Sequence, residues 1–163
     1  MKQTDNFKFD EANVMNELVY RNLSEDEKRQ ICAWKYGGEY DLYNLPSYEE
    51  MQVRQIGFMN PQREKNYYGF WDESILVGFV NILEEKEEVF IGIGVNPDLC
   101  NKHYGQRMLL ITYEISKKLY PDKPLYLEVR TWNIRAVKCY QKAGFRIDGQ
   151  AYELTTGIGT GTF

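Results

Sequence analysis

Hydrophobic residues recur at helical spacing in two stretches near the start of the chain. A short strand is predicted over residues 17–23, and Ser24 followed by Glu27 has the spacing of a capping box, which predicts the start of a helix. We expect the pair Gly37–Gly38 to end this helix, because glycine readily adopts the conformation that follows a helix. A second helix is predicted over residues 47–58, before an Asn-Pro step that would stop it.

From Asn66 onward, hydrophobic and polar residues alternate, which is typical of half-buried strands. Three strands are predicted, over residues 67–71, 75–83 and 89–95, and short polar turns separate them. This order predicts an antiparallel meander.

The part of the chain after residue 95 combines the helical and the strand spacing of apolar residues. Apolar residues recur at helical spacing from Met108 to Leu119, which predicts a helix that ends before Pro121. The segment PLYLEVRTW is predicted to be a strand, and Asn133 and Gly144 are expected to bound a short helix as its N-cap and its stop. Strands that alternate with helices after a meander predict an α/β fold (α+β by some conventions), with a central mixed twisted sheet flanked by helices.

The tail from Ala151 to Phe163 is predicted to be a hairpin with a Gly-rich turn. We expect it to pair with the sheet and to form one side of a cleft, because a strand edge left open is a hazard that proteins cover. A homodimer is one way to cover that edge.

The length of 163 residues fits a single domain. Residues 1–16 are polar and weakly patterned, so we expect an N-terminal extension there and the domain over residues 17–163. Hydrophobic residues make up 43% of the chain and charged residues 27%, which is typical of a chain that buries a core.

Charge and cysteine content exclude several classes of protein. The formal net charge of -4 has the wrong sign for a protein that binds a phosphate backbone, so nucleic acid is not expected as a partner. No apolar stretch is long enough to cross a membrane and the start of the chain is polar, so we expect a cytoplasmic protein without a membrane partner. Three scattered cysteines and one histidine predict neither a metal site nor a disulfide framework.

The run VNPDLCNKHYGQRMLL places a loop with Gly105 directly before a helix. The first turn of a helix presents backbone N–H groups without partners at the positive end of the helix dipole, which favours a bound anion such as a pyrophosphate. Lys102 and Arg107 would add full charges beside it. The alternative is a tight turn that binds nothing.

This run and the later run LYLEVRTWNIRAVKCYQKAGF together resemble the GNAT superfamily of acetyl-CoA-dependent N-acetyltransferases, over roughly residues 18–149. The second run is the more specific, and it is similar to the ribosomal-protein alanine N-acetyltransferases. The loop departs from the family pattern, since only Gly105 is kept and His103 stands where glycine is usual. A Cβ at a positive φ costs energy there, so CoA binding would be weakened unless the side chain turns away.

The resemblance implies acetyl-CoA as cosubstrate and CoA as product. The residues implied to contact it lie at the end of a strand, in the atypical loop and on the last helix: Ile93, Val95, Cys100, Asn101, Lys102, His103, Tyr104, Gly105, Gln106, Arg107, Asn133 and Tyr140.

Two residues are implied to act in catalysis. Glu128, in the LEV position, corresponds to a glutamate that takes a proton from the amine, and Tyr140 to a tyrosine that protonates the departing CoA thiolate. The alternatives are a structural ion pair of Glu128, either with its neighbour Arg130 or across strands, and a tyrosine that only packs in the core.

The predicted activity is acetyl transfer to a primary amine by direct attack. An alkyl amine, with a pKa of about 10.4, is mostly protonated at neutral pH, so a base is needed. An aromatic wall for the amine, from here on called the acceptor, is expected from four residues of one region: Trp34, Tyr36, Tyr40 and Tyr43. The acceptor is left open between a peptide N-terminus, a lysine, a polyamine and an aminoglycoside. The alternatives are a non-catalytic module that binds or senses acyl-CoA and a plain nucleotide-binding protein.

Overall fold

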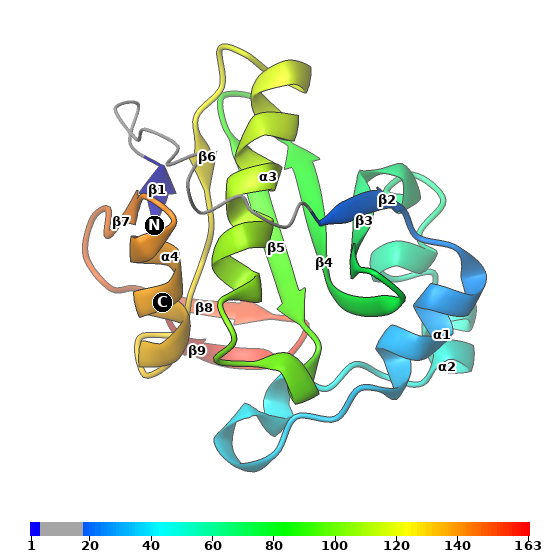
Figure 1. The fold of residues 1–163 in the computed structure, drawn as a ribbon. Coiled ribbons are helices and arrows are strands. Elements are labelled where there is room, and N and C mark those ends of the chain that lie inside the picture. Colours follow the sequence, from blue (N-terminus) through cyan, green and yellow to red (C-terminus); the bar gives the residue numbers. More distant parts are fainter. Residues whose placement is uncertain (4–17) are drawn as a thin grey trace.

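The computed structural model describes residues 1–3 and 18–163 and contains one mixed seven-stranded sheet in the order β2-β3-β4-β5-β6-β1-β7 (Figure 1). Its strands are β1 (Lys2–Gln3), β2 (Val19–Asn22), β3 (Tyr67–Asp72), β4 (Ile75–Glu84), β5 (Val89–Val95), β6 (Leu125–Tyr126) and β7 (Phe145–Arg146). Only the β5–β6 pairing is parallel among the described strands. The predicted α/β architecture and the meander β3-β4-β5 are confirmed.

Helices cover both faces of this sheet. They are α1 (Glu25–Ala33), α2 (Tyr48–Arg54), α3 (Tyr104–Leu119) and α4 (Ile134–Lys142), with the 3-10 turns η2 (Gly38–Tyr43), η3 (Gly57–Met59), η4 (Glu64–Asn66) and η5 (Pro97–Leu99). Gly78 of β4 contacts Met108 of α3, whereas the next residue, Phe79, packs against Trp34 just after α1. Because successive strand residues point to opposite faces, α3 and the α1–α2 layer lie on opposite sides of the sheet.

The helix starts follow the sequence, but two of the ends differ. Ser24 and Glu27 form the expected capping box, yet α1 ends at Ala33 rather than at Gly37–Gly38. Trp34 turns into an extended conformation there and is 9% exposed, so its burial under β4 ends the helix early. The second predicted helix, 47–58, is α2 followed by the separate turn η3, with the left-handed Gln55 between them.

The strand expected over PLYLEVRTW is much shorter than predicted. Only Leu125 and Tyr126 belong to β6, and Leu127 adds a backbone hydrogen bond to Met1. The chain then leaves the ladder, and Arg130 is 5% exposed instead of following the predicted alternation.

Two expectations about the ends of the chain are corrected. Lys2–Gln3 were placed in an extension, but they form β1 between β6 and β7; the remainder of that extension lies outside the described residues. The C-terminal hairpin, β8 (Glu153–Thr156) with β9 (Gly159–Thr162), forms a sheet of its own and does not pair with the main one. Since β1 fills the position between β6 and β7, the hairpin is held instead by Thr131, whose N–H donates to the Thr162 carbonyl at 2.9 Å.

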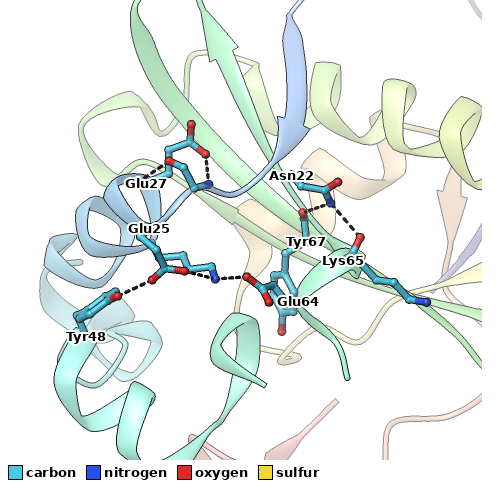
Figure 2. A network of polar contacts seen from close by, with 9 residues as sticks. Asn22, Glu25, Glu27, Tyr48, Glu64, Lys65 and Tyr67 are labelled. Carbon is cyan, nitrogen blue, oxygen red and sulfur yellow. Dashed lines mark hydrogen bonds and ion pairs between the residues drawn. The ribbon is translucent and has the colours of Figure 1, made fainter. Parts of the chain in front are cut away.

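A polar network fixes the α1–α2 layer to the rest of the fold (Figure 2). Lys28, 2% exposed, donates from Nζ to Glu25 at 2.8 Å and to Glu64 of η4 at 2.7 Å, and Tyr48 of α2 donates to the other Glu25 oxygen. Burial alone would lower the pKa of Lys28, but the two carboxylates outweigh it and the pKa is raised. The charged lysine therefore ties three elements together.

None of the described helices is long and apolar enough to span a membrane.

Candidate active site

The main opening in the sheet lies between β5 and β6. Their parallel pairing consists of Val89 with Leu125 and Phe90 with Tyr126, after which the two segments diverge. The Asn96 N–H donates to the Val77 carbonyl at 2.8 Å. Hydrogen-bonded and non-hydrogen-bonded residue pairs alternate along an antiparallel ladder, so the backbone groups of Val95 and Ile93 point away from β4. A polar backbone edge therefore faces the opening.

A cavity of about 810 Å³ occupies this opening. Most of the residues predicted for the site line it: Trp34, Tyr36, Tyr43, Ile93, Val95, Cys100, Asn101, His103, Tyr104, Gly105, Gln106, Glu128, Asn133 and Tyr140. Tyr40, Lys102 and Arg107 are not among the lining residues. The structure thus brings the two sequence runs together around one cavity.

The start of α3 forms one end of the cavity. His103 precedes the helix with φ 65°, in the left-handed region, and its side chain makes no capping hydrogen bond. The strained position predicted for this histidine is confirmed. The first hydrogen bond at the helix start runs from the N–H of Arg107 to the His103 carbonyl at 3.2 Å. The N–H groups before it have no acceptor within the helix and can bind an anion.

Glycine at position 105 allows α3 and α4 to pack closely. A Cβ there would lie 3.0 Å from Cys139 Sγ of α4. This close approach brings the side of α4 against the α3 start, and Gln106 fixes it with a 3.3 Å hydrogen bond to the Lys142 carbonyl.

The cations that line the cavity are not the predicted ones. The Arg107 guanidinium lies 4.0 Å from Asp72 and over the ring of Tyr104. Lys138 and Lys142 of α4 line the cavity instead. Sequence reasoning missed them, although their spacing of four residues places both on one face of a helix.

Tyr140 lies on α4 and faces the cavity. Burial raises the pKa of its hydroxyl well above the ordinary value of 10.0. The hydroxyl is therefore protonated at neutral pH and can donate a proton.

Glu128 lines the cavity just beyond β6. It accepts a 3.3 Å hydrogen bond from the Tyr152 hydroxyl, and among the described residues no ion pair joins it to Arg130. Arg130 instead donates to the Gly159 carbonyl at 3.0 Å, and its guanidinium lies 4.5 Å from the centre of the Phe163 ring. The structure therefore does not form the Glu128–Arg130 pair that was the alternative to a base.

The segment after α1 bridges the two sides of the opening. Tyr36 donates to the Val95 carbonyl on one side, and on the other side Asn133 Nδ2 donates to the Tyr43 hydroxyl at 3.1 Å. Asn133 also caps α4, as predicted, by accepting from the Ala136 N–H. Tyr40 packs on Trp132 rather than lining the cavity.

Several lining residues were missed by the sequence reasoning. They come from the meander and the C-terminal hairpin: Tyr67, Phe79, Asn81, Phe90, Gly92, Gly94, Thr156, Gly157, Ile158 and Phe163. The meander residues alternate along their strands, so the period of two could have placed them on one face of the sheet. The tail lines one side of the cavity, as expected from the sequence, although no signal there indicated which of its residues would do so.

Comparison with solved structures shows which proteins share this fold. A GNAT-family acetyltransferase from Bacillus anthracis is 16% identical, with a TM-score of 0.72 over 99% of this chain and 94% of that chain. A spermidine N-acetyltransferase from Vibrio cholerae in complex with CoA and spermine is 18% identical, with a TM-score of 0.69 over 89% and 91%. The aminoglycoside acetyltransferase AAC(6')-Ib in complex with coenzyme A and kanamycin is 17% identical, with a TM-score of 0.67 over 89% and 91%.

Sequence comparisons add two findings. No curated protein matches the sequence. Residues 29–145 match the model of the acetyltransferase (GNAT) family. Because this match spans well over half of the 163 residues and the fold agrees with it, the chain belongs to the acetyltransferase (GNAT) family.

Proposed function

We propose that the protein transfers an acetyl group from acetyl-CoA to a primary amine by direct attack of the amine. The observation that carries this proposal is the opening between β5 and β6, which connects an anion-binding helix start with a cavity that contains Glu128 and Tyr140. The similar solved structures include complexes with CoA and with acetyl-CoA, which supports the choice of cosubstrate.

The residues present fit CoA at two places. The N–H groups at the start of α3 suit a pyrophosphate, and Lys138 and Lys142 add positive charge to the same cavity from α4, which packs against that helix start. The edge of β5 at Ile93 and Val95 offers backbone groups to the amides of an extended arm. The bound cosubstrate would supply the acetyl group as a thioester.

The side chains of the cavity divide the proton transfers between them. Glu128 takes a proton from the ammonium group of the acceptor, directly or through water, so that the neutral nitrogen can attack the thioester carbon. A backbone N–H on the free edge of β5 donates to the carbonyl oxygen as negative charge develops on it. As the carbon–sulfur bond breaks, the Tyr140 hydroxyl gives its proton to the sulfur. The nitrogen that attacked carries a positive charge until it loses a second proton, which passes through water to restore the Tyr140 hydroxyl, while the proton held by Glu128 returns to solvent.

One experiment separates this proposal from a non-catalytic module that only binds acyl-CoA. The purified protein is mixed with acetyl-CoA, a panel of primary amines and a thiol reagent, and the release of free CoA thiol is followed. Amine-dependent release of the CoA thiol supports the proposed enzymatic function. Tight CoA binding by calorimetry without release for any amine would show a binding module instead.

Two further expectations belong to this proposal. We expect the protein to act in the cytoplasm and to form a homodimer that completes the acceptor side beside the C-terminal hairpin. Light scattering at tens of micromolar protein tests the dimer, and a strict monomer would contradict it.

A further inference from the structure

The part of the cavity on the α1 side of the sheet is called here the acceptor chamber. Its walls are aromatic side chains from five segments: Trp34, Tyr67, Phe79, Phe90 and Phe163. Its floor carries no side chains at Gly92 and Gly94, which lie directly across from Asn81 and Phe79 in the β4–β5 ladder. The Phe79 ring packs over Gly94, and Gly92 has no side chain between Asn81 and the Phe90 ring, so the floor is formed by backbone and aromatic carbon.

The ring faces of this chamber are already in contact with other groups. Tyr67 stacks on Phe79 with a centroid separation of 6.4 Å, and Trp34 packs against Phe79 at 6.3 Å. The Phe163 ring holds the guanidinium of Arg130. These rings therefore provide apolar contact area rather than free faces for additional cations.

Carboxylates are scarce among the described residues that line the cavity. Within residues 1–3 and 18–163, Glu128 is the one acidic lining residue, whereas Arg130, Arg135, Lys138 and Lys142 are basic. The reacting ammonium can pair with Glu128 before it loses its proton. A second ammonium on the same molecule would lose its water without finding a carboxylate, which is strongly unfavourable.

Asn81 adds an uncharged polar group to the chamber. Asn81 is 8% exposed, and its Oδ1 accepts no hydrogen bond from any residue that the structure describes. It lies between Tyr67 on β3 and Gly92 on β5. An amide there can exchange a hydrogen bond with a neutral group of the acceptor, but it cannot offset a full charge.

On the basis of the proposed function, we infer that the acceptor is a monoamine with an apolar body, and that polyamines and aminoglycosides, which carry several ammonium groups, are poor acceptors. Glu128 takes the single charge, the aromatic walls and glycine floor hold the body, and Asn81 receives one neutral polar group. The similar solved structures with spermine or kanamycin share the fold, but the charges of this cavity do not suit a polycation.

A matched pair of acceptors tests this inference. n-Hexylamine and 1,6-diaminohexane have the same chain length and differ in the second ammonium group. We expect kcat/KM to be at least about tenfold higher for the monoamine at neutral pH, because the diamine must bury an unpaired charge. Equal values, or a preference for the diamine, would overturn the inference.

Variants that add a carboxylate to the chamber should reverse this selectivity. Asn81→Asp places one at the floor, and Ile158→Glu places one on the hairpin, where the side chain is 40% exposed and a charge is tolerated by the fold. At least one of them is expected to shift the ratio towards the diamine by about fivefold or more. Gln62→Glu adds the same charge at an exposed position outside the cavity and should leave the ratio unchanged. Melting curves identify a variant that fails to fold, and folded variants with unchanged ratios would count against the chamber.

Calorimetry distinguishes failure of this inference from failure of the proposed function. The protein saturated with CoA is titrated with each amine, so that binding is read without turnover. Binding of the monoamine without its acetylation would contradict the proposed enzymatic function but leave the inference about the acceptor standing. Equal binding of both amines, or binding of neither, would refute the inference even if another amine is acetylated.

Discussion

The hydroxyl of Tyr36 donates a 2.6 Å hydrogen bond to the carbonyl of Val95, the last residue of β5. Burial raises the pKa of this tyrosine far above its ordinary value, so the hydroxyl stays a donor throughout the neutral range. Seven residues after Tyr36, the Tyr43 hydroxyl accepts a hydrogen bond from Asn133. One segment is therefore attached to both sides of the opening between β5 and β6. The width of the site therefore depends on this segment.

Tyr36→Phe removes the hydrogen bond to Val95 and leaves the ring. We expect a loss of about 1 kcal/mol in the free energy of unfolding, measured with urea, together with weaker CoA binding. Tyr40→Phe is the matched control, since Tyr40 lies in the same segment but packs on Trp132 outside the cavity. Equal effects of the two changes would show that the Val95 contact does not hold the opening.

Tyr140→Phe tests the acid. The change removes one hydroxyl from a packed helix face, so the melting temperature should change little while kcat falls by roughly 100- to 10,000-fold, the usual range for loss of a general acid. Tyr43→Phe serves as the comparison, because it removes a hydroxyl that is bonded to Asn133. An unchanged rate in Tyr140→Phe would leave this tyrosine a packing role only.

Glu128→Gln tests the base through the pH dependence of the rate. With a carboxylate in place, the ammonium of the acceptor can be deprotonated near neutral pH. Without it, the rate must follow the neutral fraction of the free amine, so kcat/KM should drop and its rising limb should move to higher pH. Identical pH profiles for both proteins would exclude Glu128 as the base.

Lys138→Ala with Lys142→Ala should weaken CoA binding by about tenfold or more, because both cations line the cavity and lie on α4, which packs against the α3 start. Binding of dephosphorylated pantetheine should be unaffected. Lys102→Ala is the control, as Lys102 is exposed and does not line the cavity. Calorimetry of the three proteins with both ligands is the measurement. Equal losses of affinity for CoA and for pantetheine would show that α4 does not contribute to the phosphate site.

The network of Figure 2 predicts a loss of stability in acid. Hydrogen bonds from Lys28 and then Tyr48 lower the pKa of Glu25 below its ordinary value of 4.5. The stability it contributes is therefore complete above pH 4.5 and is lost as the pH falls through the lowered pKa. Urea unfolding should show that Glu25→Gln is less stable than the parent at neutral pH but loses less of its stability on acidification. Glu50→Gln, in an exposed pair with Arg54, should keep the parent's acid dependence.

The order of the elements could be predicted because it depends on local patterns. The capping box at Ser24, the period-two strands and the Asn133 cap are short-range signals, and all three are confirmed. The end of α1 could not be predicted in this way, because it is set by the burial of Trp34 against Phe79, a contact between distant parts of the chain.

The site shows the same division. The left-handed conformation of His103 was implied by the resemblance, since His103 stands where the family pattern has glycine, and it is confirmed. The choice of Lys102 and Arg107 as phosphate ligands rested on closeness in sequence, whereas the cavity is lined by Lys138 and Lys142 because Gly105 lets α4 pack against α3. Which cations gather at a site depends on that tertiary contact.

The C-terminal hairpin gives the molecule a replaceable part. It follows residue 145, where the match to the family model ends, and it is attached through Arg130 and Thr131 to the segment that carries Glu128. Thr156, Gly157, Ile158 and Phe163 contribute a wall of the cavity, whereas Tyr152, just before β8, donates a hydrogen bond to Glu128. A change confined to the wall residues can therefore alter which amine is accepted while acetyl-CoA binding and the contact to Glu128 are inherited intact, so that substrate range and chemistry can diverge separately in evolution.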